Sequence, residues 1–268
     1  MTHGSLFTGG AAGFDNAAEY AGIKTIWQCE KDPFALQLLE QNFIGVTKYR
    51  AIEEMIDDID NIERADIISG GFPCQPFSTA SRNRRGKFDD RYLWPQMRTI
   101  IEHLRPRWVL AENVVGITSL ELPQIISDLD ALGYDLPRDF EGNYIIPSIP
   151  AAGVGAAHVR QRIFIIAFDE RTQLPDVSNT HGARLPGGIF SQWFSQTDRI
   201  LQGETVVQSD RVRTNSLWEK ALTPHILRDA YGIPRRINRI KSLGNAVVPQ
   251  IPYIIFQMIK ILEENNGY

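Results

Sequence analysis

The first 170 residues alternate between two hydrophobic patterns. Short apolar runs predict five strands: Ser5 to Phe7, Thr25 to Cys29, Ala65 to Ser69, Trp108 to Ala111 and Ile163 to Phe168. Stretches with helical spacing of apolar residues predict four helices: Asp15 to Ala21, Asp32 to Asn42, Leu93 to Leu104 and Leu122 to Leu132. Strands that alternate with helices are typical of βαβ units. The pattern therefore predicts an α/β fold with a mostly parallel sheet.

This pattern breaks at about residue 169. From there to residue 223 the chain is rich in Thr, Gln, Ser, Asn and Gly, with scattered aromatic residues and no sustained period. A helical pattern returns at Ile251 to Leu262. We therefore expect a main domain formed by residues 1–168 and 224–268, and a small irregular lobe formed by residues 169–223.

Composition narrows the class of protein. A chain of 268 residues that is 43% hydrophobic can bury a full core. It has no run of 18 apolar residues, and a Gly-rich segment follows Met1 where a secreted protein would carry a basic and then apolar leader. We therefore expect a cytoplasmic protein. Cys29 and Cys74 lie far apart and lack the spacing of metal ligands, so neither a disulfide nor a bound metal is expected.

Charge is unevenly distributed along the chain. The formal net charge of −4 argues weakly against a polyanionic partner. Residues 82–107 nevertheless contain eight basic and three acidic residues, and residues 228–241 contain five basic residues and one acidic residue. On charge alone, ordinary solvated faces remain the favoured interpretation of both segments.

A glycine-rich turn follows the first predicted strand. In "SLFTGGAAGFDNAAEYAG", Gly9, Gly10 and Gly13 stand between a strand and a helix, where the backbone turns tightly or approaches a ligand closely. Glu30 follows the second predicted strand, where a carboxylate can accept hydrogen bonds from ribose hydroxyls. The pair indicates a nucleoside-containing cofactor. A dinucleotide, S-adenosylmethionine or a purely conformational turn all remain compatible with it.

Chemically active residue types follow three other predicted strands. Cys74 lies in "ISGGFPCQPFSTASR", Glu112 lies in "VLAENVVG", and Arg160 and Arg162 lie in "GAAHVRQRIFIIAF". Each has an ordinary alternative, as a loop thiol, a helix cap or a surface pair. Because ligands bind at the carboxyl ends of parallel strands, we expect a thiol, a carboxyl and a guanidinium to converge above one edge of the sheet.

The order and wording of these segments resemble the DNA (cytosine-5-)-methyltransferase family, in the compact form found in bacteria and phages. "GGFPCQPFS" is similar to the nucleophile loop of that family, "ENV" to its carboxylate motif, "HVRQRIFIIA" to its arginine motif, and "GIPRRINRIKSLGNAVVPQI" to its C-terminal motif. The resemblance covers residues 5–171 and 230–268. It implies a Rossmann-like methyltransferase fold that binds S-adenosyl-L-methionine, with residues 169–223 as a small target-recognition lobe.

The resemblance also implies roles for individual residues. Cys74 would be the nucleophile, Glu112 would contact the N3 and amino edge of cytosine, and Arg162, with Arg160, would hold the base and the loop. S-adenosyl-L-methionine would be bound by Phe7, Gly9, Gly10, Gly13, Glu30, Pro73, Leu93, Asn245, Ala246 and Val247. DNA phosphates would be bound by Ser78, Arg82, Arg84, Arg85 and Lys87.

The chain departs from the family pattern at three places. The glycine turn "FTGGAAGFD" is one residue longer than usual and has alanines where glycine is common. The segment "YRAIEE" lacks the acidic residue that often meets the adenine amino group, and Asn238 stands where the family often has Asp. These positions bear on cofactor contacts and on the C-terminal motif.

The resemblance implies covalent chemistry on double-stranded DNA by a monomer, with neither a metal nor a membrane. A thiolate that adds to cytosine C6 makes C5 nucleophilic enough to accept a methyl group. The target base must first leave the duplex, at a cost of roughly a few kcal/mol. Two alternatives stay open: a relative of the same fold that methylates tRNA, although its usual Cys-Phe-Thr segment is not found here, and a catalytically silent DNA-binding relative.

Overall fold

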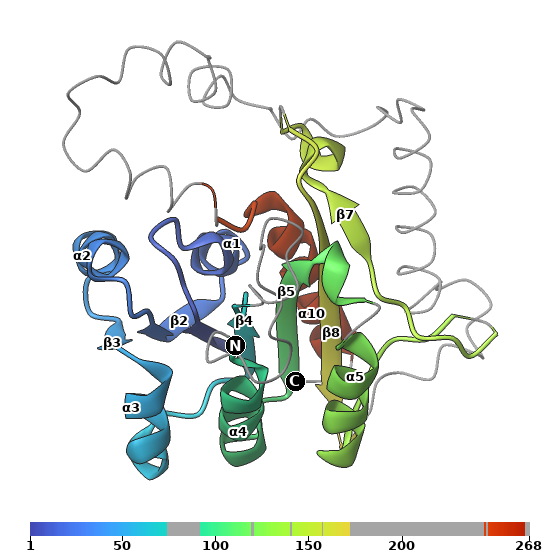
Figure 1. Ribbon diagram of the computed structural model, residues 1–268, viewed down its shortest axis with the longest axis horizontal. Helices are drawn as coiled ribbons and strands as arrows, with labels where there is room; N and C mark the ends of the chain where they lie inside the picture. The colour runs from blue at the N-terminus through green and yellow to red at the C-terminus, as the bar shows by residue number, and fades with distance from the viewer. Residues whose placement is uncertain are drawn as a thin grey trace.

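The computed structural model describes residues 1–73, 92–118, 121–139, 141–156, 158–171, 244 and 246–265. Within these ranges eight strands form one sheet in the order β3-β2-β1-β4-β5-β8-β6, and β7 pairs with β8 (Figure 1). The strands are β1 (Thr2–Leu6), β2 (Lys24–Cys29), β3 (Thr47–Tyr49), β4 (Ile67–Gly70), β5 (Trp108–Val114), β6 (Tyr134–Asp135), β7 (Ser148–Pro150) and β8 (Gln161–Asp169).

Six α-helices are described in the same ranges. They are α1 (Gly13–Tyr20), α2 (Pro33–Asn42), α3 (Ile52–Asp57), α4 (Trp94–Leu104), α5 (Leu122–Ala131) and α10 (Gln250–Asn265). Short 3-10 turns accompany them: η1 (Ile59–Asn61), η4 (Val115–Ile117) and η5 (Ala151–Val154). The helical pattern at Ile251 to Leu262 thus corresponds to α10.

Strand direction confirms the predicted α/β fold with a mostly parallel sheet. Strands β3, β2, β1, β4 and β5 run parallel, whereas β8 is antiparallel to β5, and β6 and β7 are antiparallel to β8. The chain moves from β1 to β2 on one side, and β4 pairs with β1 on the other. Such a reversal of strand order opens a crevice at the carboxyl ends of the strands, where ligands bind in folds of this type.

Helices cover both faces of the sheet. Alternate residues of β4 point to opposite faces, so Ile68 packs toward α3, α4 and α5 while Ile67 packs toward α1 and α10. Strand β5 behaves in the same way, with Val109 on the first face and Trp108 and Leu110 on the second. Because both faces are buried, these central strands are nearly continuous apolar runs.

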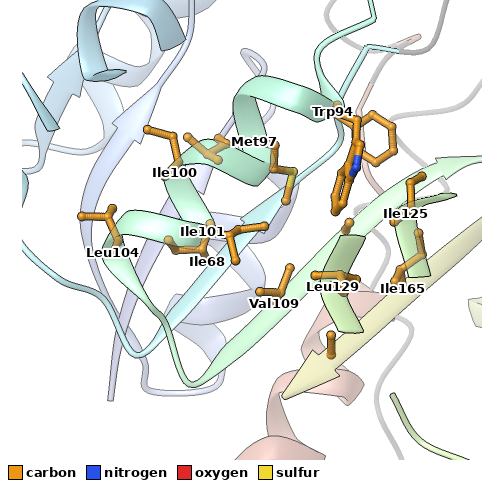
Figure 2. Packing of buried hydrophobic residues seen from close by; sticks show 14 of the residues in the cluster. Ile68, Trp94, Met97, Ile100, Ile101, Leu104, Val109, Ile125, Leu129 and Ile165 are labelled. Carbon is orange, nitrogen blue, oxygen red and sulfur yellow. The ribbon is translucent and has the colours of Figure 1, made fainter. Parts of the chain in front are cut away.

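Helix α4 shows how the sequence pattern becomes packing. Met97, Ile100, Ile101 and Leu104 recur at helical spacing and lie against the sheet, with α5 alongside (Figure 2). Burial of each such side chain contributes about 1.5–3 kcal/mol. The helix ends at Arg105, whose φ of 49° is left-handed. This packing fixes the positions of Leu93 and Trp94, close to residue 92, where the described chain resumes.

Several element boundaries differ from the sequence prediction. Strand β1 begins at Thr2 and not at Ser5, because the polar residues of "THGSL" are buried and paired by hydrogen bonds. It ends before Phe7, whose φ of 53° leaves the β region. Strands β3, β6 and β7 and helix α3 were not predicted, since elements of two to six residues are too short to show a period.

The second lobe stays a prediction. Residues 172–243 lie outside the described ranges, so the boundaries proposed at 169, 223 and 224 are untested. Among the helices that the structure describes, none combines the length and the apolar character that a membrane crossing requires.

Candidate active site

The turn from β1 to α1 leaves space beside its backbone. Gly9 has a φ of 70°, and a Cβ atom added there would have no heavy atom within 4 Å. Ala12 caps α1 with a φ of 47°, a left-handed conformation that costs a residue with a side chain about 1–2 kcal/mol. The amide of Ala12 donates to the Gly9 carbonyl at 3.2 Å, which closes the turn. The open side of Gly9 is therefore a place where a ligand can approach the main chain.

Gly13 and Val247 bring the two ends of the chain together. A Cβ atom on Gly13 would lie 2.3 Å from the Val247 carbonyl oxygen, so only glycine permits this contact. Val247 precedes α10, which packs against α1 through the cluster that contains Phe14 and Ile255. The C-terminal segment is thereby held against the start of α1, beside the glycine turn.

Glu30 lies where β2 ends, half-buried beside the same turn. Its Oε2 accepts a hydrogen bond from the Gly9 amide at 2.7 Å, and its Oε1 accepts one from the Asp32 amide at 2.7 Å. Asp32 in turn caps α2 by accepting from the amides of Phe34 and Ala35. Each carboxylate oxygen has a further lone pair, so Glu30 can also accept from ribose hydroxyls while it anchors the turn.

A buried polar network joins β1, α1 and β2 next to the glycine turn. The sequence analysis did not identify it. Asp15 accepts hydrogen bonds from the Ser5 hydroxyl at 3.0 Å and from the Gln28 amide at 2.8 Å. The Thr8 hydroxyl donates toward Ser5. Burial raises the pKa of Asp15 to about 6, although its two donors lower it. The signal that was available is an acidic residue on the apolar, core-facing side of the first helix.

Glu112 and Arg162 come together at the end of β5 and the start of β8. Arg162 lies opposite Val114 in the antiparallel pair, and Glu112 is two residues earlier on the same face of β5. Arg162 Nε is 3.0 Å from Glu112 Oε1. On the other side, a Cβ atom on Gly71 would be 3.2 Å from Glu112 Oε2. The carboxyl group thus lies between the arginine and the chain that leaves β4.

Burial dominates the electrostatics of this carboxyl group. Desolvation raises the pKa of Glu112 to about 6, although the charges of Arg162 and Arg160 act in the opposite direction. A carboxyl group with this pKa can hold or release a proton near neutral pH. It is therefore suited to general acid–base chemistry or to sharing a proton with a bound base.

Asn113 holds the chain that leads to Cys74. Its side-chain amide donates to the Phe72 carbonyl at 3.0 Å, and its Oδ1 accepts from the Val114 amide at 2.9 Å. The ring of Phe72 packs edge-on against Tyr92 and at a tilt against Trp94, with centroid separations of 6.5 and 5.4 Å. Phe72 and Tyr92 are therefore packed together, and they lie on either side of residues 74–91, which are outside the described ranges.

Arg160 has a different partner from Arg162. Its Nη1 donates to the carbonyl oxygen of Gly244 at 2.5 Å, across 84 residues of sequence. Gly244 lies three residues before Val247. Arg160 thus joins the start of β8 to the C-terminal segment, whereas Arg162 joins β8 to β5.

The structure places some of the predicted site residues and not others. The described ranges include Phe7, Gly9, Gly10, Gly13, Glu30, Pro73, Leu93, Glu112, Arg160, Arg162, Ala246 and Val247. The structure brings Gly9 to Glu30, Gly13 to Val247, and Glu112 to Arg162, and Leu93 is buried at the start of α4. Cys74, Ser78, Arg82, Arg84, Arg85, Lys87, Asn238 and Asn245 lie outside the described ranges. Cys74 is next in sequence to Pro73, so its attachment point is fixed even though its position is not described.

The arrangement fits a nucleoside cofactor. In the part of the chain that the structure describes, no group of three or more His, Cys, Asp or Glu side chains could hold a metal ion. The open side of Gly9, the carboxylate of Glu30 and the close approach of Val247 to Gly13 fit S-adenosylmethionine.

Comparison with known families decides the relationship. The family model described as C-5 cytosine-specific DNA methylase matches residues 1–220. The chain belongs to this family. The match confirms the resemblance found in the three sequence motifs that carry Cys74, Glu112 and Arg162, and the C-terminal motif at residues 232–251 lies beyond it.

The individual relatives have low sequence identity to this chain and are longer than it. Type II methyltransferase M.PspPI of Psychrobacter sp. (strain TA137) is 32% identical over 177 residues, which cover 62% of this chain and 39% of the relative. Type II methyltransferase M.HgiCII of Herpetosiphon aurantiacus is 28% identical over an alignment of 275 positions, which covers 84% of this chain and 59% of the relative. The chain therefore spans about half the length of the curated relatives it matches.

A solved structure supports the fold. The crystal structure of S. pombe Dnmt2 methyltransferase has a TM-score of 0.59 and covers 98% of this chain and 99% of its own. Its sequence identity is 17%, so this likeness concerns the fold alone. It agrees with the Rossmann-like methyltransferase fold expected from the C-5 cytosine-specific DNA methylase motifs.

Proposed function

We propose that this chain is a DNA cytosine-5 methyltransferase that transfers a methyl group from S-adenosyl-L-methionine to C5 of a cytosine flipped out of double-stranded DNA. The observation that carries the proposal is the pair of buried Glu112 and half-buried Arg162, which lies beside Gly71 at the point where the chain leads to Cys74. Family membership supports the same reaction.

Cys74 supplies the nucleophile in this proposal. Its thiolate adds to C6 of cytosine, and the electron pair of the C5–C6 bond becomes available at C5. A free thiol has a pKa of about 8.5, so the thiolate needs help from nearby positive charge or from loop amides. We assign this role to the Arg162 side chain. It contacts Glu112, which lies beside Gly71 at the start of the segment that leads through Pro73 to Cys74.

Glu112 stabilises the charge that develops on the base. As the thiolate adds to C6, electron density grows toward N3 and O2 of the ring. A protonated or proton-sharing carboxyl group next to N3 lowers the energy of this state. The raised pKa of Glu112 makes the protonated form accessible near neutral pH, and Arg162 holds the carboxyl group in place.

The cofactor site is formed by Phe7, Gly9, Gly10, Gly13, Glu30, Pro73, Leu93, Asn245, Ala246 and Val247 in this proposal. S-adenosyl-L-methionine supplies an electrophilic methyl group on a positively charged sulfur. Glu30 accepts from the ribose, the turn at Gly9 lets the main chain approach the ligand, and Val247 covers the site from the C-terminal side. After C5 has been methylated, loss of the C5 proton expels the Cys74 thiolate and restores the ring.

DNA binding is assigned to two segments that, apart from residues 169–171, lie outside the described residues. Ser78, Arg82, Arg84, Arg85 and Lys87 bind phosphates, which position the duplex without specifying its sequence. Residues 169–223 read the target sequence. We assign the active unit as a cytoplasmic monomer, and neither a metal nor a membrane takes part.

One assay separates this function from its alternatives. Purified protein is incubated with radiolabelled S-adenosyl-L-methionine and, in parallel, with duplex DNA or tRNA, using Glu112→Gln as the matched variant. The proposal predicts labelled 5-methylcytosine in DNA and a strong loss in the variant. Label in tRNA alone would assign the chain to the RNA-methylating alternative, and no label in either substrate would indicate a catalytically silent relative.

A further inference from the structure

We propose that Arg160 is a positioning residue that holds the C-terminal wall of the cofactor site in place, and that Arg162 serves the base side alone. The inference rests on the proposed function, since it assigns the two arginines of one motif to the two substrates of that reaction. It separates Arg160 from the catalytic residues with which the sequence resemblance had grouped it.

The first observation is a chain of contacts from β8 to the glycine turn. Arg160 donates to the Gly244 carbonyl, Val247 lies three residues further along, and the Val247 carbonyl is packed against Gly13. A Cβ atom on Gly71 would be 4.0 Å from a Val247 methyl group, so the same segment also borders the chain that leads to Cys74. A shift of Gly244 is therefore transmitted to the wall beside Gly13.

The backbone of Arg160 is held in an unusual conformation. Its φ of 28° lies in the left-handed region, which is unfavourable for a residue with a side chain and persists only where the surroundings enforce it. Here the Ala151 amide bonds to the Val159 carbonyl at 2.7 Å and approaches the Arg160 carbonyl at 3.3 Å. These bonds fix the turn that precedes β8 and so fix the origin of the Arg160 side chain.

The second observation is the charge environment of the two guanidinium groups. Both arginines lower the pKa of Glu112, and Glu112 acts in return on Arg160. Within the described residues, the hydrogen bond of the Arg160 side chain goes to the Gly244 carbonyl. Arg160 Nε is also buried and lacks a hydrogen-bond acceptor within the described residues. Arg160 thus acts on the cofactor side through Gly244.

Arg162 provides the contrast within the same strand. Its Nε meets Glu112 and its Nη1 donates to the neighbouring Gln161 carbonyl. Within the described residues, these polar contacts involve the carboxyl group and its own strand. The two side chains carry the same charge and stand two residues apart, so a comparison of their variants isolates the effect of the partner.

The experiment uses two measurements on the full chain. The dissociation constant of S-adenosyl-L-methionine is measured by calorimetry. The addition step is measured without cofactor, as release of tritium from C5 of cytosine in DNA: the Cys74 thiolate adds to C6, a solvent proton adds to C5, tritium leaves from C5, and the thiolate is expelled. Arg160→Met, Arg160→Lys and Arg162→Met are compared with the unmodified chain, with thermal unfolding as the test of folding.

Arg160→Met should weaken cofactor binding about tenfold to a hundredfold, the range expected for loss of a charge-assisted hydrogen bond, and by a larger factor than it slows tritium release. Arg162→Met should show the reverse order. Arg160→Lys keeps a charged donor for Gly244 and should recover part of the affinity. Equal cofactor binding by Arg160→Met and the unmodified chain, or the same order of effects in both Met variants, would overturn the inference.

The design also separates this inference from the proposed function. If the unmodified chain binds the cofactor but methylates no DNA, the function is wrong, while the binding comparison still supports or contradicts the role of Arg160. If it methylates DNA and Arg160→Met binds cofactor normally, the function stands and the proposed role of Arg160 is wrong. Absence of cofactor binding by the unmodified chain contradicts both.

Discussion

Arg162 Nε lies 3.0 Å from Glu112 Oε1 across the antiparallel pair of β8 and β5. The arginine stabilises the carboxylate, whereas burial favours the protonated acid, and burial has the larger effect. The pair is therefore balanced near the pH at which the proposed reaction would take place. This balance can be shifted by changing either partner.

The pH dependence of kcat/KM tests the pair. If proton sharing with cytosine requires protonated Glu112, the contribution of this group falls as the pH rises through about 6. Glu112→Gln should abolish this limb of the profile, along with most activity. Arg162→Met should move the limb to higher pH, because the charge that lowers the pKa of Glu112 is removed. A limb that stays in place in Arg162→Met would argue against the pair as its origin.

His3 should make the fold sensitive to acid. It is buried between the Thr25 and Ser69 hydroxyls, and burial lowers its pKa from 6.5 to about 3. His3 therefore binds a proton below about pH 6.5 in the unfolded chain, but only near pH 3 in the folded chain. Stability from this group is present above pH 6.5 and is lost as the pH falls toward 3, by about 2–3 kcal/mol between pH 7 and pH 4.5.

Urea unfolding at the two pH values measures this loss. His3→Gln removes the titrating group. Between pH 7 and pH 4.5, the unfolding free energy of this variant should therefore fall by about 2–3 kcal/mol less than that of the unmodified chain. If the variant and the unmodified chain lost stability in parallel, His3 would not be the sensitive group.

Asp15 should have the opposite effect in the same pH range. Its pKa is raised from 3.8 to about 6, so the folded chain binds the proton more tightly and loses stability as the pH rises through 6. Asp15→Asn removes this loss. Relative to the unmodified chain, the variant should gain about 2 kcal/mol between pH 4.5 and pH 7, measured by urea unfolding. A relative loss would show that the ionised carboxylate is stabilised by its Ser5 and Gln28 donors.

Gly13→Ala tests the closure of the cofactor site. The added Cβ atom would lie 2.3 Å from the Val247 carbonyl oxygen, so the C-terminal segment must move away. We expect the dissociation constant of S-adenosyl-L-methionine, measured by calorimetry, to rise at least about tenfold, as for a loss of roughly 1.4 kcal/mol. Gly142→Ala is the control, because it strains a φ of 87° in an exposed turn with open space around it. Equal effects of both substitutions would point to general destabilisation.

Much of the fold could be predicted from the sequence because the central elements have strong periods. The runs at Ile67 and Trp108 are buried on both faces, and α4 and α5 carry regular apolar stripes. The contact between Glu112 and Arg162 was also predictable in outline. Glu112 was expected to follow one buried strand and Arg162 to precede another, at the same edge of the sheet. Edge strands of two or three residues contain no period, so β3, β6 and β7 were missed.

The remaining features depend on contacts between distant segments. The pairing of Arg160 with Gly244 spans 84 residues, and it distinguishes two arginines that look equivalent in "HVRQR". The left-handed conformation of Phe7 and Ala12 is imposed by the turn and not by residue type, because neither residue favours it. The hydrogen bonds of Asp15 to Ser5 and Gln28 likewise join three separate elements, so the helical pattern alone did not identify its partners.

The central claim is that Cys74 forms a covalent bond to cytosine C6 during methyl transfer to DNA. Duplex DNA with 5-fluorocytosine at the target position tests it directly, because methylation leaves no C5 proton whose loss could expel the thiolate. A stable protein–DNA adduct should form only with S-adenosyl-L-methionine and should map to Cys74 by mass spectrometry. Cys29 is an internal control, since it is buried and burial raises its pKa to about 12. An adduct on Cys29, or normal methylation by Cys74→Ser, would contradict the account.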